Sequence, residues 1–137
     1  MPISESLKNR LYPSLETIAS HFGTPFHIYD EDGIRRTCRQ LKNGFAGIER
    51  FREYYAVKAL PNPAILKIMA EEGFGFDCSS ATELLLAREV GGKGEEIMFT
   101  SNNTSERDFL LAEKDGGCIL NRDDLSLLDK VPRIHDT

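Results

Sequence analysis

Residues 52–66, REYYAVKALPNPAIL, place a lysine, Lys58, between an apolar run and a proline turn. Burying an ammonium group is costly, so a lysine in this position needs either solvent or a chemical role. The run that contains it, YYAVKA, is short and mostly apolar, as in strands that are covered on both faces. The following Asn62 and Pro63 are typical of a helix N-cap and first helical position. The stretch therefore predicts a strand, a lysine at the strand's end and the start of a helix.

The same pattern recurs along the rest of the chain. Apolar segments begin at residues 54, 76, 96 and 118, so successive starts are 22, 20 and 22 residues apart. Helix signals lie between these segments, with serines that precede an acidic residue by three positions and glycines at the expected C-caps. These signals are Ser80 with Glu83, Ser105 with Asp108, Asn121 or Asp123 before DLSLLDKV, and the glycines 73, 91 and 116.

Strands and helices that alternate at this period predict parallel strands joined by right-handed crossovers. Four such units form either a small open sheet or one half of an eight-stranded barrel. The repeat by itself is compatible with both.

The first 50 residues follow a different pattern. PSLETIASHFG predicts a helix that ends at Gly23, PFHIYD alternates like a strand, and EDGIRRTCRQLKNGF predicts an amphipathic helix. We therefore expect a leading region of helix, strand and helix over residues 1–50, followed by α/β units over residues 51–137.

Composition narrows the possible partners. The 137 residues are enough for one domain with a core, and the net charge of −5 comes with scattered rather than clustered basic residues. Nucleic acid and acidic membrane surfaces are therefore poor partners. No apolar run approaches the roughly 20 residues of a membrane span, and the N-terminus lacks the apolar core of a secretory signal.

The cysteines and histidines predict no disulfide and no metal site. Cys38, Cys78 and Cys118 are odd in number and form no CxxC pair, so we expect reduced thiols in a cytoplasmic protein. Cys78 is expected to be a small buried residue rather than a nucleophile. The three histidines lack the spacing of a metal site or a catalytic triad.

Chemistry-bearing residues should gather at the carboxyl ends of the parallel strands. Those ends carry Lys58, then Asp77 with Cys78, Ser79 and Ser80, then residues 100–103, then Asn121. A lysine in a partly desolvated pocket can form a Schiff base with a carbonyl, whereas a lysine just past a strand can simply face water. Spacing alone leaves both interpretations open.

The longer stretch YYAVKALPNPAILKIMAEEGFGFDCSSATEL resembles the fold-type III pyridoxal-phosphate decarboxylases, the diaminopimelate, ornithine and arginine decarboxylase family related to alanine racemase. Upstream, GTPFHIYDEDGIRRTCRQL resembles the start of the same family. Downstream, EEIMFTSNNTSERDF and GGCILNRDDLSLL continue the resemblance, which extends from about Thr17 to Leu128.

The resemblance implies a fold, a cofactor and roles for three residues. The fold is the first half of an alanine-racemase-like (β/α)8 TIM barrel, about four βα units preceded by an N-terminal helix and strand. The cofactor is pyridoxal 5'-phosphate, and Lys58 is the residue that forms its Schiff base. Asp77 lies near the cofactor and acts through its charge, although it could also be an acid that favours the following helix N-terminus. Ser101 enters the site from the third strand, and neighbouring Asn102 could be only a turn residue.

The sequence also departs from the family pattern. Leu60 stands where the family usually has asparagine. The family's cofactor-stacking histidine, glycine-rich phosphate loop and Glu-Pro-Gly-Arg segment are missing. We therefore expect a fragment of a longer enzyme that is inactive alone.

For the parent we expect an amino-acid decarboxylase that converts meso-diaminopimelate to lysine and CO2 and, at full length, forms a homodimer. The alternatives are an ornithine, arginine or carboxynorspermidine decarboxylase, a racemase, a non-catalytic regulatory piece that binds a full-length decarboxylase, and a flavodoxin-like open sheet.

Overall fold

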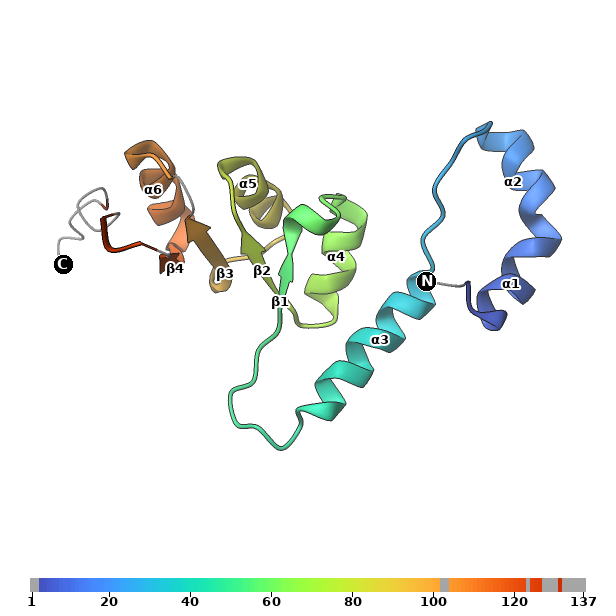
Figure 1. The fold of residues 1–137 in the computed structure, drawn as a ribbon, viewed down its shortest axis with the longest axis horizontal. Coiled ribbons are helices and arrows are strands. Elements are labelled where there is room, and N and C mark those ends of the chain that lie inside the picture. The colour runs from blue at the N-terminus through green and yellow to red at the C-terminus, as the bar shows by residue number, and fades with distance from the viewer. Residues whose placement is uncertain (1–2, 102–103, 123, 127–130, 132–137) are drawn as a thin grey trace.

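The computed structural model describes residues 3–101, 104–122, 124–126 and 131. Figure 1 shows a parallel sheet with its connecting helices, and an N-terminal helical region that extends away from it. The four strands lie in the order of the sequence, and each pairs in parallel with the next. Their bounds are β1 (Tyr54–Ala56), β2 (Gly75–Cys78), β3 (Gly94–Ser101) and β4 (Cys118–Arg122). The predicted strand starts are thus confirmed to within two residues.

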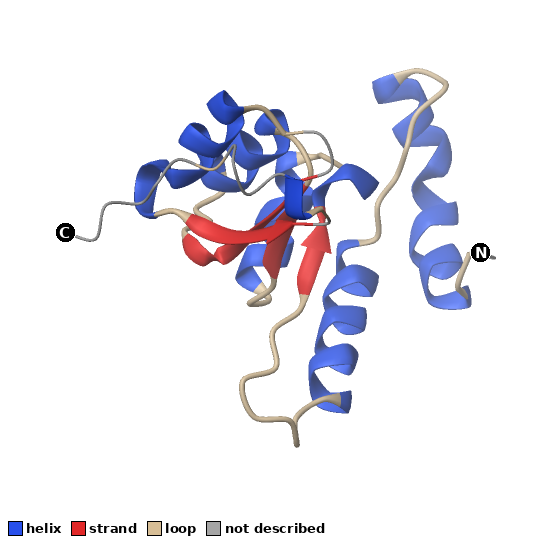
Figure 2. Cartoon of the chain, turned by 60° about the vertical axis from the view of Figure 1, so that its left-hand side comes forward, coloured by secondary structure: helices blue, strands red, loops and turns tan. Residues whose placement is uncertain are grey.

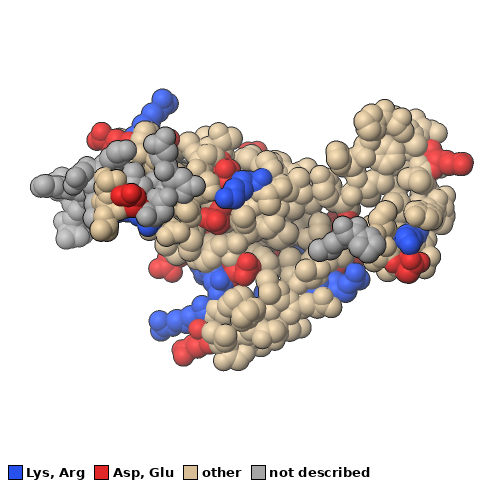
Figure 3. Space-filling view, viewed as in Figure 1, with Lys and Arg blue, Asp and Glu red and all other residues tan. Residues whose placement is uncertain are grey.

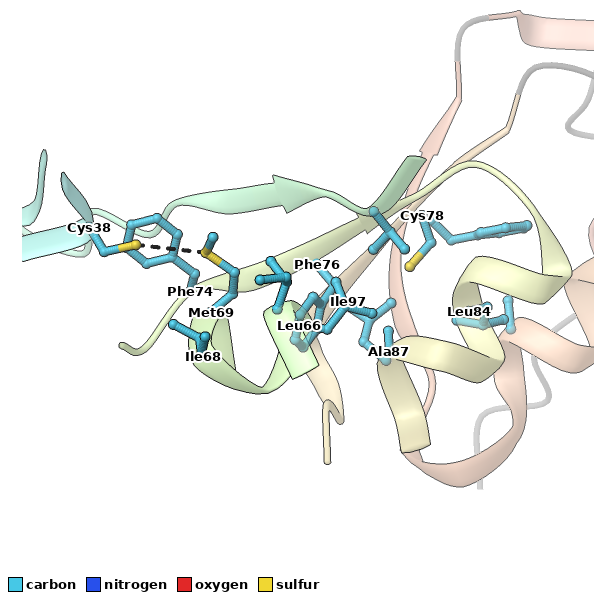
Figure 4. Close-up of a cluster of buried hydrophobic side chains, with 14 residues drawn as sticks. Cys38, Leu66, Ile68, Met69, Phe74, Phe76, Cys78, Leu84, Ala87 and Ile97 are labelled. Atoms are coloured by element: carbon cyan, nitrogen blue, oxygen red, sulfur yellow. Dashed lines mark hydrogen bonds between the residues drawn. The ribbon is translucent and has the colours of Figure 1, made fainter. Parts of the chain in front are cut away.

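Three helices connect these strands and pack on one face of the sheet, as Figure 2 illustrates. They are α4 (Pro63–Glu71), α5 (Ala81–Glu89) and α6 (Glu106–Glu113). The strand side chains that meet them alternate along the chain, because successive side chains of a strand point to opposite faces. In β2 and β3 the residues packed in the core with these helices are Phe76, Cys78, Ile97 and Phe99. Figure 4 shows this cluster with Leu66 of α4 and Leu84 and Ala87 of α5.

The strand residues between these core positions lie on the face without helices. Asp77, Met98 and Thr100 are half-buried there. A doubly wound open sheet reverses its strand order and carries helices on both faces, so the sequential order and one-sided helices rule out the flavodoxin-like alternative. The fold is α/β and corresponds to the first half of a (β/α)8 barrel.

The helices begin at the predicted caps. Asn62 Oδ1 accepts a hydrogen bond from the backbone N–H of Ala64 at 2.9 Å, with Pro63 in the first helical position. Ser105 and Asp108 form a reciprocal capping box at the start of α6. These short side chains satisfy backbone donors that have no partner within the helix.

The cap of α5 differs in one detail from the predicted capping box. Ser80 Oγ accepts from the backbone N–H of Glu83 at 3.3 Å. The Glu83 carboxylate, however, accepts from the backbone N–H of Ser79 at 2.9 Å and from the Ser80 hydroxyl at 3.0 Å. The carboxylate thereby secures the turn that joins β2 to α5.

Two of the three predicted glycine caps are confirmed: Gly73 and Gly91 follow the ends of α4 and α5, whereas Gly116 is the last residue of the 3₁₀ helix η3 (Lys114–Gly116), and α6 is capped by Lys114 instead. Gly73, Gly91 and Gly116 have φ angles of 79°, 101° and 96°. This left-handed region is open to glycine and strained for most other residues. The helix predicted for DLSLLDKV falls largely outside the described residues, as does Asp123. Within it, Asp124 Oδ1 accepts from the backbone N–H of Ser126 at 2.7 Å.

The N-terminal region consists of helices, and one prediction for it is wrong. Its elements are α1 (Glu5–Leu11), the short 3₁₀ helix η1 (Tyr12–Ser14), α2 (Leu15–Phe22) and α3 (Glu31–Gly44). Helices α2 and α3 were expected, whereas α1, capped by Ser4, was not. Residues 25–30 form no strand; this segment links α2 to α3, and none of the four described strands pairs with it. Alternation describes the two faces of a segment, but a strand also needs a hydrogen-bonding neighbour.

Helix α3 is fixed to the sheet layer by apolar contacts and a buried carboxylate. Cys38 Sγ lies 3.7 Å from Met69 Sδ of α4 (Figure 4). The Glu72 side chain, only 6% exposed, accepts from Arg39 at 2.8 and 3.1 Å and from Arg35 at 3.3 Å. Lys42 donates to the backbone carbonyl of Glu72. Because Glu72 follows the last residue of α4, these cations also lie at the negative end of that helix's dipole.

In the described residues, no helix is both long enough and apolar enough to cross a membrane. The domain boundary expected near residue 50 stays a prediction.

The buried face of α4 should dominate the stability of the sheet layer. Leu66 is 0% exposed and Leu85, on α5, is 54% exposed. We expect Leu66→Ala to lower the free energy of unfolding by about 2–5 kcal/mol through lost burial and a residual cavity. The matched change Leu85→Ala should cost less than about 1 kcal/mol. Urea denaturation followed by circular dichroism measures both, and equal losses would contradict the assigned core.

The docking of α3 should depend on pH through Glu72. Hydrogen bonding to Arg39 lowers the pKa of Glu72 below its ordinary value of 4.5. A lowered folded-state pKa stabilises the fold fully above pH 4.5, and this contribution is lost as the pH falls through the folded-state value. Glu72→Gln should therefore reduce the urea midpoint at neutral pH and differ progressively less from the parent in acid.

The control for this measurement is Glu89→Gln, a change of the same kind at an exposed position of α5. It should alter the midpoint little at any pH. A Glu72→Gln effect that is the same at neutral and acidic pH would contradict the assignment.

Candidate active site

Lys58 stands on a short turn directly after β1. The strand ends at Ala56, and Val57–Ala59 form the 3₁₀ helix η2 rather than continuing the predicted strand. Val57 is fully buried, while Lys58 is exposed. Leu60, on the other side of the turn, packs against the core. The two apolar neighbours thus fix the backbone on either side of Lys58.

The amine of Lys58 has no partner among the described residues. Within the described part of the chain, its Nζ makes no hydrogen bond within 3.5 Å and no ion pair within 4.0 Å. By contrast, the cationic side chains of Arg10, Arg35 and Arg39 are engaged by carboxylates. A strand-end lysine without an internal partner is available to an external group, which is the property that Schiff-base formation needs.

Asp77 lies on the neighbouring strand, on the face without helices. It is directly opposite Ala56 in the strand register, two residues before Lys58. Its Oδ1 accepts a hydrogen bond from the hydroxyl of Thr100, on β3, at 2.6 Å. Thr100 Oγ1 in turn accepts from Asn121 Nδ2, on β4, at 3.4 Å. The carboxyl ends of three adjacent strands are therefore connected by side chains, next to the strand that leads to Lys58.

Ser101 is the last residue of β3 and pairs with Arg122 of β4. Its backbone thus lies at the same carboxyl end of the sheet as Lys58 and Asp77. Its side chain lies outside the described residues, as do Asn102 and Asn103, so its predicted contact with a cofactor stays a prediction.

Two members of this cluster were given no such role by the sequence. Both stood among the strand-end residues, Thr100 without a role and Asn121 also as one of two possible helix caps, with Asp123 as the other. The available signal was the period of two: Thr100 is two residues after Met98, on the opposite face from Phe99, and Asn121 is its register partner on β4. Only the relative register of the strands brings both into line with Asp77.

Cys78 adjoins Asp77 but faces the core (Figure 4). It is fully buried, and burial raises the pKa of its thiol to about 12. The thiolate is the reactive form, so this cysteine is a packing residue, as expected, and not a nucleophile.

Acidic and basic side chains are mixed over the face of the molecule shown in Figure 3. The described residues form no continuous basic surface on this face. This distribution suits a small ligand held by a few directed groups better than a polyanion held by many cations.

A family model described as pyridoxal-dependent decarboxylase, pyridoxal binding domain, matches residues 31–137. The chain belongs to this family. The resemblance inferred from YAVKA, NPAIL and FDCSS is thereby confirmed, and pyridoxal phosphate is the cofactor of the family. The free amine of Lys58 and the carboxylate of Asp77 at one sheet edge fit such a group.

Individual relatives agree with this assignment. The chain is 48% identical over 136 residues to Protein TabA of Pseudomonas amygdali pv. tabaci, covering 99% of this chain and 32% of that protein. It is 36% identical over 118 residues to the diaminopimelate decarboxylase of Methanothermobacter thermautotrophicus, covering 85% of this chain and 27% of that protein. The chain therefore spans about a third of the length of the curated relatives it matches.

The solved structures give the same result for the fold. The crystal structure of diaminopimelate decarboxylase from Helicobacter pylori, complexed with L-lysine, matches with a TM-score of 0.79 and 30% sequence identity. The match covers 85% of this chain and 29% of that one. The half-barrel deduced from strand order and one-sided helices is the arrangement found in this neighbour.

Proposed function

We propose that this chain is the cofactor-holding N-terminal part of a pyridoxal-phosphate-dependent amino-acid decarboxylase. The observation that carries the proposal is the uncommitted, exposed amine of Lys58 at the end of β1, beside the strand that bears Asp77, in a chain of this family.

In this proposal Lys58 would hold the cofactor through its amine. The buried Val57 and the packed Leu60 fix the lysine's backbone at the carboxyl end of the sheet, which keeps the amine within reach of one position. When bound, pyridoxal phosphate accepts the electron pair that the departing CO2 leaves on the substrate.

Asp77 is assigned an electrostatic role near the cofactor. A carboxylate held by a hydroxyl donor keeps a fixed negative charge and a fixed direction, which suits it to orient a neighbouring cationic or N–H group. Ser101 is proposed to contact the cofactor from the end of β3, because its backbone reaches the same sheet edge.

The proposed substrate is meso-diaminopimelate, which would give lysine and CO2. Support comes from the relatives in Methanothermobacter thermautotrophicus and Helicobacter pylori, both named diaminopimelate decarboxylases. Ornithine, arginine or carboxynorspermidine is the alternative substrate. We further propose a homodimer for the whole protein, since the sites of this family take residues from both subunits.

The test compares Lys58→Ala with Lys67→Ala, the same change at an exposed position of α4. Both are made in the whole gene product that carries these 137 residues. Lys58→Ala should abolish the absorbance band of bound pyridoxal phosphate and reduce CO2 release by about a thousandfold or more, because the cofactor's covalent anchor is lost. Lys67→Ala should change neither.

Release of CO2 is then measured with meso-diaminopimelate, ornithine, arginine and carboxynorspermidine in parallel. The proposal expects the highest kcat/KM with meso-diaminopimelate. A parent protein that binds pyridoxal phosphate but releases no CO2 from any of them would contradict decarboxylation. A parent that binds no cofactor yet associates with a separate decarboxylase would instead support the regulatory alternative.

A further inference from the structure

We infer that Thr100, supported by Asn121, is a positioning residue that acts on the cofactor through the carboxylate of Asp77. The inference rests on the proposed function, because it assigns a role within the same site. It rests on a different observation, the chain of side-chain hydrogen bonds that crosses β4, β3 and β2.

The three side chains are hydrogen-bonded in one direction, from Asn121 through Thr100 to Asp77. The Nδ2 group of Asn121 has only donors, and the carboxylate of Asp77 has only acceptors. The Thr100 hydroxyl must therefore direct its one proton to Asp77 Oδ1, at 2.6 Å. A hydroxyl that accepts one hydrogen bond is a stronger donor of the next, so Asn121 reinforces the contact to Asp77.

The strand register fixes the positions of these hydrogen-bonded side chains within the sheet. Thr100 and Asn121 are directly opposite each other, whereas Asp77 is opposite Met98, one layer lower on the same face. Lys58 is two residues beyond Ala56, the partner of Asp77, and lies on the 3₁₀ helix η2 that follows β1. The carboxylate thus lies one layer below the end of the sheet, between the strand of Lys58 and the strand of Thr100.

Only one oxygen of Asp77 is used. Within the described residues Oδ1 accepts from Thr100, and no hydrogen bond to Oδ2 is present. A carboxylate fixed through one oxygen can present the other to a bound N–H or cationic group in a constant direction. Without the hydroxyl of Thr100 the side chain of Asp77 can rotate, and ordering it again upon binding costs entropy.

The contact differs from the structural hydrogen bonds of the fold. Caps such as those of Ser80 and Ser105 satisfy backbone groups at the ends of helices. The contact between Thr100 and Asp77 instead joins two side chains on the half-buried face that carries no helix. Besides linking β2 to β3, the contact therefore holds the Asp77 carboxylate on the face that the helices leave open.

The test is a double-mutant cycle on pyridoxal-phosphate affinity in the whole gene product, measured by absorbance titration. Thr100→Val removes the hydroxyl at nearly constant volume and should weaken binding about tenfold, the loss of one hydrogen bond to a charged group. Thr100→Ser retains the hydroxyl and should stay within about twofold of the parent. Asn121→Leu should have a smaller effect than Thr100→Val, because it acts one step further away.

The decisive measurement repeats Thr100→Val in an Asp77→Ala background. Action through Asp77 predicts that the second change then alters the affinity less than about twofold. Thr82→Val, an exposed threonine of α5, is the matched control and should have no effect in either background. Urea midpoints of all variants separate loss of binding from loss of folding.

Three outcomes have definite meanings. Non-additive losses with rescue by Thr100→Ser support the inference. Equal losses in the parent and in the Asp77→Ala background overturn it, even if Lys58 holds the cofactor as proposed. A parent that binds no pyridoxal phosphate overturns the proposed function, and the inference with it.

Discussion

The buried row of Phe76, Cys78, Ile97 and Phe99 holds helices α4, α5 and α6 against one face of the parallel sheet. Because side chains alternate along a strand, every residue committed to this row commits its neighbours to the other face. Asp77 and Thr100 lie on that second face for this reason alone. The same packing that supplies the hydrophobic stability of the layer also decides which polar groups can reach a ligand.

At the strand ends, residues that pack in the core stand next to residues with candidate chemical roles. Val57 and Leu60 contribute apolar surface to the core, and the exposed amine of Lys58 lies between them. Cys78 is buried with its thiol protonated, and the adjacent Asp77 is half-buried with its carboxylate hydrogen-bonded. Each chemically useful side chain is thus next to one that fixes its backbone. This arrangement keeps reactive groups in place without a long mobile loop.

Local signals in the sequence were sufficient for most of the fold. The starts of the four strands, the caps Asn62, Ser80 and Ser105 and the C-terminal glycines Gly73 and Gly91 depend on residues only a few positions apart. The structure agrees with them, with the strand starts within two residues. Features that depend on distant residues were not predictable in this way. Residues 25–30 alternate like a strand, but alternation does not supply a partner strand. The repeat alone left both the open sheet and the half-barrel possible; the family resemblance implied the half-barrel, and the observed strand order confirms it.

The site residues likewise fall into those that local patterns predict and those that depend on distant residues. Lys58 and Asp77 were found because strand ends and a family resemblance point to them directly. Thr100 and Asn121 join Asp77 only through the register of β2, β3 and β4, which no local pattern specifies. The turn at Val57–Ala59 likewise depends on the burial of Val57 beneath it.

The central claim is that Lys58 is the residue that holds pyridoxal phosphate. Its most direct test is to add the cofactor to the whole gene product, reduce the complex with borohydride, and locate the pyridoxyl label by peptide mass spectrometry. The account predicts a single major label on the peptide that contains Lys58. A label spread over the exposed lysines, or one concentrated on a lysine other than Lys58, would contradict it.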